Sequence, residues 1–126
     1  MNIPSDLHYT SHDEWIRLDG DIAVLGITDF AQDALGEIVY VELPEVGDSV
    51  EAGGAICEVE SVKAVAEVYS PVAGEVVAVN EELDGSEETV NQDPYGGGWL
   101  VKISLSNPGS LDGVMDAEAY KAKIAD

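Results

Sequence analysis

The sequence feature that most constrains the fold is a succession of short apolar runs separated by turn residues. These runs alternate with Asp-Gly, Pro or Gly-Gly punctuation from about residue 14 to residue 105. The pair Asp19-Gly20 lies between two apolar runs and predicts a β-hairpin over residues 14–27. No run is long enough to cross a bilayer as a helix. Many short strands at close spacing predict a mainly β fold, a small barrel or sandwich.

Two segments carry helix signals instead. Residues 28–36 begin with Thr28 or Asp29 as a cap and end at Gly36, which predicts a short helix after the first hairpin. The tail over residues 108–126 opens on a proline and is also predicted to be helical. The stretch 81–98 is acidic and then glycine-rich, and it is predicted to be a long loop.

Length and charge limit the classes of function. A chain of 126 residues is expected to form one domain, 1–126, with its β core at about 20–105 and a helical segment at about 108–126. Twenty-six acidic residues against five basic ones give a net charge of -21. Such a surface repels nucleic acid and anionic membranes, so neither is an expected partner. It favours basic docking faces on partner proteins, or simply solubility in a salt-rich cytoplasm.

The remaining chemistry-bearing residues do not predict an active site. Cys57 lies in an apolar run and is interpreted as a buried, inert thiol, which fits a reducing cytoplasmic location. The N-terminal residues have neither a basic nor an apolar region, so no presequence is predicted. His8 and His12 are separated by three residues on a polar segment with no helical period, so no metal site is expected. A monomer is expected.

Lys63 stands out because it is the one basic residue between Arg17 and Lys102. Two apolar runs of similar length flank it, at residues 55–60 and 64–69. A hairpin built from these runs places the lysine at its tip, exposed on a stiff support. A swinging prosthetic arm needs such a position, because a modifying enzyme must reach the amine. The simpler interpretation is a surface lysine paired with a neighbouring glutamate.

The chain also resembles the H proteins of the glycine cleavage system along almost its full length. The matching segments, in family order and with family-like spacing, are Tyr9-Thr10, Glu14-Trp15, Gly26-Ile27-Thr28-Asp29, Ala31-Gln32, Leu35-Gly36-Glu37, Val39-Tyr40-Val41-Glu42-Leu43-Pro44, Glu60-Ser61-Val62-Lys63-Ala64, Tyr69-Ser70-Pro71-Val72, Gly74-Glu75-Val76, Val90-Asn91, Asp93-Pro94-Tyr95-Gly96, Gly98-Trp99 and Ser106-Asn107-Pro108.

The resemblance implies a lipoyl-domain-like barrel-sandwich hybrid and a lipoate amide-linked to Lys63 within the motif Glu60, Ser61, Val62, Ala64. It implies a carrier that catalyses no step, since the chemistry belongs to the cofactor and the partners. In that family the carrier takes an aminomethyl group of glycine from the pyridoxal-phosphate decarboxylase (P protein) to the folate-dependent aminomethyltransferase (T protein). The resemblance also implies that dihydrolipoyl dehydrogenase (L protein) reoxidises the arm and that a lipoate-attaching enzyme loads it.

Two acidic residues match family positions that hold the amine of the loaded arm. Glu14 precedes the tryptophan, and Glu67 follows the lysine by four residues, where the family commonly has aspartate. The preceding run is Ser11-His12-Asp13, whereas the family usually has histidine immediately before the glutamate. An ordinary solvated carboxylate is the alternative interpretation of each glutamate.

Four other functions remain open at this point. A lipoyl domain of a 2-oxoacid dehydrogenase shares the fold but usually has Asp-Lys-Ala at its tip and a Pro/Ala-rich linker. A biotin carrier has methionines where Val62 and Ala64 stand. An H-like protein can also donate lipoyl groups to other enzymes. The last alternative is a β domain without lipoate that serves only as an interaction module.

Overall fold

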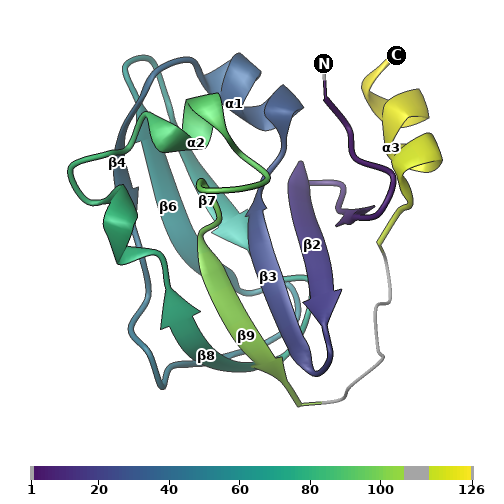
Figure 1. Cartoon of the computed structure of the whole chain (residues 1–126), viewed down its shortest axis with the longest axis vertical. Coiled ribbons are helices and arrows are strands. Elements are labelled where there is room, and N and C mark those ends of the chain that lie inside the picture. Colours follow the sequence, from purple (N-terminus) through teal and green to yellow (C-terminus); the bar gives the residue numbers. More distant parts are fainter. Residues whose placement is uncertain (1, 107–113, 126) are drawn as a thin grey trace.

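Two antiparallel sheets form the frame of the computed structural model, which describes residues 2–106 and 114–125 (Figure 1). The six-stranded sheet has the order β1-β2-β3-β9-β8-β5, and the three-stranded sheet has the order β4-β6-β7. The strands are β1 (His8–Tyr9), β2 (Glu14–Asp19), β3 (Ile22–Ile27), β4 (Ile38–Glu42), β5 (Ser49–Val50), β6 (Ala55–Ser61), β7 (Val65–Tyr69), β8 (Gly74–Val79) and β9 (Val101–Leu105). The predicted mainly β fold is confirmed.

The first hairpin forms where the Asp-Gly pair predicts it. Strands β2 and β3 pair in continuous register from Glu14 opposite Ile27 to Asp19 opposite Ile22. Gly20 takes the left-handed φ of 64° that this turn requires and that glycine adopts without steric cost. Strand β3 also pairs antiparallel with β9, a strand far along the chain that links the first hairpin to β8 and β5 in the six-stranded sheet.

In the described part of the chain, two short helices and one 3-10 turn lie between strands, and a third helix follows the last strand. The predicted short helix is α1 (Asp29–Leu35), and the hydroxyl of its N-cap Thr28 accepts the Ala31 N–H at 3.1 Å. The predicted loop at 81–98 is only partly irregular, because it contains η1 (Glu81–Leu83) and α2 (Thr89–Gln92). Both carry a buried apolar residue, Leu83 and Val90, whose burial against the sheets favours local helix over loop.

The helical C-terminus is confirmed over α3 (Ala117–Ile124). Asp116 caps this helix, its side chain accepting the Ala119 N–H at 2.9 Å. The expected start near Pro108 lies outside the described residues. Met115 is not helical but pairs with Tyr9 in an isolated bridge. Within the described residues, no helix has the length and apolarity needed to cross a membrane.

The apolar core has two parts. One fills the space between the two sheets and includes Ile16, Leu25, Val59, Val68 and Ile103. The other lies where α3 and the N-terminal segment cover β1 and β2, and its buried members are Ile3, Leu7, Tyr9, Trp15, Val24, Ala117 and Tyr120. The C-terminal helix therefore packs on the edge of the large sheet beside the turn between β1 and β2 (Figure 1).

Candidate functional site

Lys63 lies at the tip of the hairpin formed by β6 and β7. These strands pair from Ala55 opposite Tyr69 to Glu60 opposite Val65, so the predicted hairpin is confirmed. The Lys63 side chain is exposed. No ion pair joins it to Glu60 or to any other acidic residue in the described part of the chain. The primary amine is thus presented to solvent, without the glutamate partner that the simpler interpretation requires.

The tip owes its shape to Ser61. The Ser61 hydroxyl accepts the N–H groups of Lys63 at 3.3 Å and Ala64 at 3.0 Å and donates to the Ala64 carbonyl at 3.1 Å. The Ser61 N–H donates to the same carbonyl at 2.8 Å. These local hydrogen bonds close the turn on a short polar side chain, as serine commonly does. The four motif positions predicted around the lysine are therefore brought together at one turn.

The lysine turn is hydrogen-bonded to the segment after α1, which in turn is hydrogen-bonded to Asn91 of α2. The sequence did not predict these contacts. The Asn91 side chain donates to the Gly36 carbonyl at 2.7 Å and accepts the Ile38 N–H at 2.9 Å. The carbonyl of the intervening Glu37 accepts the Val62 N–H at 3.0 Å. Asn91 therefore fixes the backbone on which the lysine turn rests. The sequence signal for it was the matched pair Val90-Asn91.

Glu14 is not a solvated carboxylate. Its side chain is 2% exposed; the Thr10 hydroxyl donates to Oε1 at 2.8 Å and the Tyr69 N–H to Oε2 at 2.6 Å. Burial raises the pKa of the Glu14 carboxyl, and these two hydrogen bonds oppose the rise. No lysine or arginine in the described residues forms an ion pair with it. The nearby His12 also acts to lower this pKa, but a buried carboxylate without a lysine or arginine partner retains capacity to accept an ammonium group.

Tyr69 connects the two predicted arm-contact residues. Its N–H binds Glu14, and its hydroxyl donates to Oε2 of Glu67 at 3.0 Å. The His12 ring packs against the Tyr69 ring at a centroid distance of 4.9 Å. A cleft of about 240 Å³ opens here and is lined by Thr10, Ser11, His12, Glu14, Ala52, Gly53, Tyr69, Ser70 and Pro71. Thus Ser11 and Glu14 border the same cleft, and Glu67 stands next to it through Tyr69.

Glu67 is exposed and belongs to a row of carboxylates on the outer face of the small sheet. Glu58 pairs directly with Glu42 on one side and with Glu67 on the other. Partial desolvation and these neighbouring carboxylates raise the pKa of Glu58. Like charges placed opposite each other destabilise a sheet, so the contribution of these carboxylates to stability does not explain their presence.

The residues at the tip fit a covalently attached lipoyl group. The amine of Lys63 is exposed and without an ion-pair partner in the described part of the chain, and the turn that carries it is held by its own hydrogen bonds. A cleft lined by the Glu14 carboxylate lies at the other end of strand β7, which follows the lysine turn. A lysine on a hairpin tip of a two-sheet β domain defines the class of prosthetic-group carrier domains.

Comparison with known proteins narrows this class. The family model described as "Glycine cleavage H-protein" matches residues 7–126. A glycine cleavage system H protein of Symbiobacterium thermophilum is 53% identical over 121 residues, covering 96% of this chain and 94% of that protein. One of Thermus thermophilus is 54% identical over 121 residues, again covering 96% and 94%. The crystal structure of the H protein of Mycobacterium marinum superimposes with a TM-score of 0.90 at 36% identity, covering 98% of this chain and 100% of that one.

The chain belongs to the glycine cleavage H-protein family. It is a lipoyl carrier component of the glycine cleavage system, and proteins of this family carry lipoate covalently on a lysine. The alternatives of a 2-oxoacid dehydrogenase domain, a biotin carrier and a lipoate-free interaction module do not fit this family.

Proposed function

We propose that Lys63 is the lipoylated residue and that Glu14 and Glu67 hold the amine of the cargo. The observation that carries the proposal is the exposed amine of Lys63, without an ion-pair partner among residues 2–106 and 114–125, on a hairpin whose far end borders a buried carboxylate. The predicted motif residues Glu60, Ser61, Val62 and Ala64 surround the lysine and form or flank its turn.

When bound, lipoate supplies a disulfide that can be reduced and can carry the aminomethyl group of glycine between enzymes. The rest of the proposal concerns the chain itself. An ammonium group entering the cleft would meet the carboxylate of Glu14, which Thr10 and Tyr69 hold in place. A charge-assisted hydrogen bond there keeps the amine protonated, and water is restricted because Glu14 is buried. Glu67, which accepts the hydroxyl proton of the cleft residue Tyr69, adds a second negative charge nearby.

We propose that the chain catalyses no step and works as a single carrier domain and as a monomer in the cytoplasm. Both histidines stand in the first twelve residues, and the single cysteine is buried, which supports a role without chemistry of its own. The proposed partners are the decarboxylase, the aminomethyltransferase, dihydrolipoyl dehydrogenase and a lipoate-attaching enzyme. The acidic surface, with a net charge of -21, supports docking on basic faces of these partners.

The test uses lipoylated protein, the decarboxylase and glycine labelled with ¹⁴C at the methylene carbon. Wild type should retain label on the arm, and Glu14→Gln should lose it faster, because an amide cannot neutralise an ammonium group. Glu118→Gln, a change at an exposed helical glutamate, is the matched control and should behave as wild type. Equal retention by Glu14→Gln and wild type would refute the role of Glu14. Lipoylated wild type that takes up no label would favour donation of lipoyl groups to other enzymes.

A further inference from the structure

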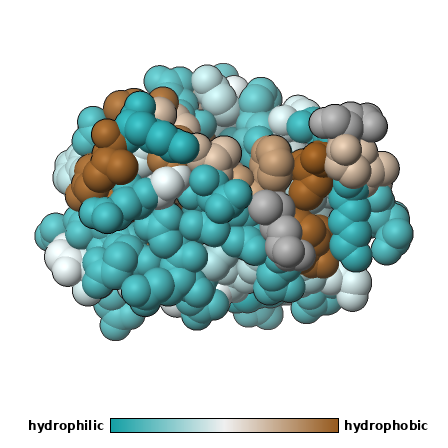
Figure 2. Space-filling view, turned by 90° about the horizontal axis from the view of Figure 1, so that it is seen from above, coloured by the Kyte–Doolittle hydropathy of each residue, from teal (hydrophilic) through white to brown (hydrophobic). Residues whose placement is uncertain are grey.

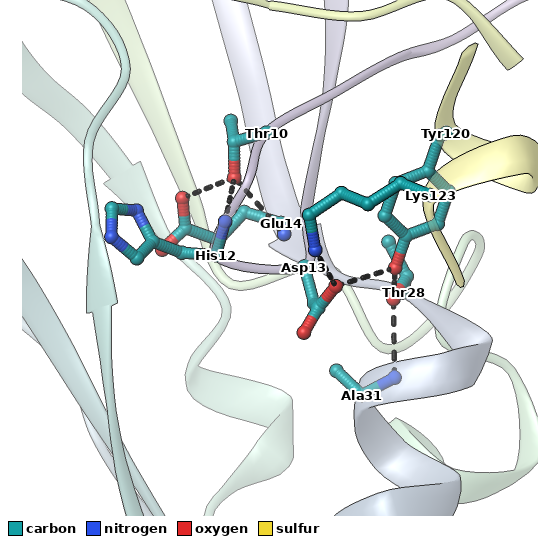
Figure 3. Close-up of polar contacts among 8 residues, drawn as sticks. All are labelled: Thr10, His12, Asp13, Glu14, Thr28, Ala31, Tyr120 and Lys123. Atoms are coloured by element: carbon teal, nitrogen blue, oxygen red, sulfur yellow. Dashed lines mark hydrogen bonds and ion pairs between the residues drawn. The ribbon is translucent and has the colours of Figure 1, made fainter. Parts of the chain in front are cut away.

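The C-terminal helix contacts the turn between β1 and β2 through Tyr120. The Tyr120 hydroxyl donates to Oδ1 of Asp13 at 3.0 Å and lies 2.7 Å from Oγ1 of Thr28 (Figure 3). Because a carboxylate can only accept, the Tyr120 proton goes to Asp13, and Thr28 therefore donates its own proton to Tyr120. Thr28 still accepts the Ala31 N–H at the start of α1. One hydroxyl thus joins α3, α1 and the turn.

Asp13 holds an uncommon backbone conformation. Its φ of 65° is the only positive value at a residue other than glycine within the described ranges. Such a conformation costs on the order of 1 kcal/mol and persists where the surroundings hold it. Here the Asp13 carbonyl accepts the Thr28 N–H at 3.0 Å, and Lys123 of α3 lies 3.9 Å from the same carboxylate oxygen that Tyr120 binds.

The opposite side of this turn faces the cleft. Oγ1 of Thr10 accepts the His12 N–H at 3.2 Å and donates to Oε1 of Glu14 at 2.8 Å (Figure 3). Asp13 is the residue between His12 and Glu14, and its own N–H donates to the Thr10 carbonyl at 3.2 Å. Asp13 and the Glu14 carboxylate thus belong to one turn whose hydrogen bonds meet at Thr10.

The same C-terminal segment also holds the strand that enters the turn. The rings of Tyr120 and Tyr9 stack with a centroid distance of 4.7 Å and an interplanar angle of 9°. Met115 exchanges two backbone hydrogen bonds with Tyr9, of 2.8 Å and 2.6 Å. The strand that enters the turn and Asp13 within the turn are thus both held by the last part of the chain, which lies outside the two-sheet core (Figure 1).

We propose that Tyr120 and Asp13 are positioning residues through which the C-terminal helix sets the Glu14 carboxylate in the cleft that receives the amine of the cargo. The inference rests on the proposed role of Glu14 and adds to it the part of the chain that holds that residue. The plainer alternative is that α3 only covers the apolar surface of Tyr9 and Trp15. The two explanations differ in the expected effect of removing the Tyr120 hydroxyl: only the first predicts a change at Glu14.

The test requires no lipoate. Tyr120→Phe removes the hydroxyl and keeps the ring stack, whereas Asp13→Gly keeps the left-handed backbone and removes the carboxylate. Lys121→Ala, at an exposed position of α3 whose nearest ion pair is with Glu118, is the control. Hydrogen exchange of the Tyr69 N–H reports the bond to Glu14, and a ¹³C titration reports the pKa of the Glu14 carboxyl.

In Tyr120→Phe we expect the Tyr69 amide to exchange about fivefold to tenfold faster, the factor that loss of one hydrogen bond implies. The Glu14 pKa should shift in the same variant, while β8 and β9 amides and the control stay as in wild type. Asp13→Gly should show the same local change. The proposal is overturned if the Tyr69 amide and the Glu14 pKa are unchanged, or if exchange accelerates equally in β8 and β9. Loss of label in Glu14→Gln tests the role of Glu14 separately, so failure of one account is distinguishable from failure of the other.

Discussion

The main-chain N–H of Tyr69 donates a 2.6 Å hydrogen bond to Oε2 of Glu14. This bond joins the last residue of the lysine-bearing hairpin to the first residue of β2, 55 positions earlier in the chain. The carboxylate is held by backbone on one side and by the Thr10 hydroxyl on the other. Strand β7, which follows the lysine turn, therefore helps to orient the buried Glu14 carboxylate through its last residue, Tyr69.

Glu14 makes stability depend on pH with a definite sign. Because its pKa in the folded state is raised above the ordinary value of 4.5, the folded protein holds this proton more tightly than the unfolded chain. Its contribution is fully present below the unfolded pKa and is lost as the pH rises through the folded pKa. The free energy of unfolding of wild type relative to Glu14→Gln should therefore fall as the pH rises from 4.5 towards neutrality. Urea titrations of both proteins across this range measure the difference.

The comparison between the two proteins cancels the titration of the other acidic residues. Glu118→Gln, which changes an exposed carboxylate of α3, should give a difference from wild type that is nearly constant over the same range. A wild-type advantage over Glu14→Gln that grows with pH would contradict the dominance of burial over the two hydrogen bonds and the nearby His12 in setting the pKa of this carboxyl.

The stability of the protein should depend on the two hydrogen bonds that the side-chain amide of Asn91 donates. In Asn91→Asp an acceptor replaces the group that donates to the Gly36 carbonyl at 2.7 Å and to the Gln32 side chain at 2.9 Å. Unfolding free energy at neutral pH should drop by about 2–3 kcal/mol, since a half-buried donor is replaced by a charge facing a carbonyl. Gln92→Glu introduces the same charge at the exposed neighbouring position and should cost less than about 0.5 kcal/mol. Equal losses for the two variants would refute the assigned role of Asn91.

Cys57 should be inert in the folded protein. Its side chain is 6% exposed, and burial raises its pKa to about 12, so very little thiolate exists near neutral pH. A thiol reagent such as 5,5′-dithiobis(2-nitrobenzoic acid) should react slowly at pH 8 and rapidly once denaturant unfolds the chain. Fast reaction of the folded protein would show that Cys57 is accessible, contrary to its place in the core.

Much of the fold could be predicted because its signals are local. The turn at Asp19-Gly20 and the helix bounded by Thr28 and Gly36 need only a few neighbouring residues, and both form where they are predicted. The pairing of β3 with β9 joins Leu25 to Val101, and no local pattern specifies such a partner. The helical turns within residues 81–98 were not predicted, because acidic and glycine-rich composition outweighs the single apolar residues that anchor them.

The candidate site divides in the same way. Lys63 could be singled out as a candidate because it is isolated in an acidic chain and lies between two runs that form a hairpin, and the resemblance to the family made the prediction specific. The burial of Glu14 could not be predicted, because its backbone partner, Tyr69, is distant in sequence and the segment before Glu14 is polar. The contact of Tyr120 with Asp13 spans 107 positions and likewise has no local signal.

The central claim, that Lys63 carries the lipoyl group, is tested most directly by intact-mass analysis of protein made together with a lipoate-attaching enzyme. Wild type should gain the mass of one lipoyl or octanoyl group, and fragmentation should place it on Lys63. Lys63→Arg should gain none, and its unfolding free energy should stay within about 0.5 kcal/mol of wild type, since the side chain is exposed. Unmodified wild type in a host that lipoylates other carriers, or an adduct that persists in Lys63→Arg, would contradict the account.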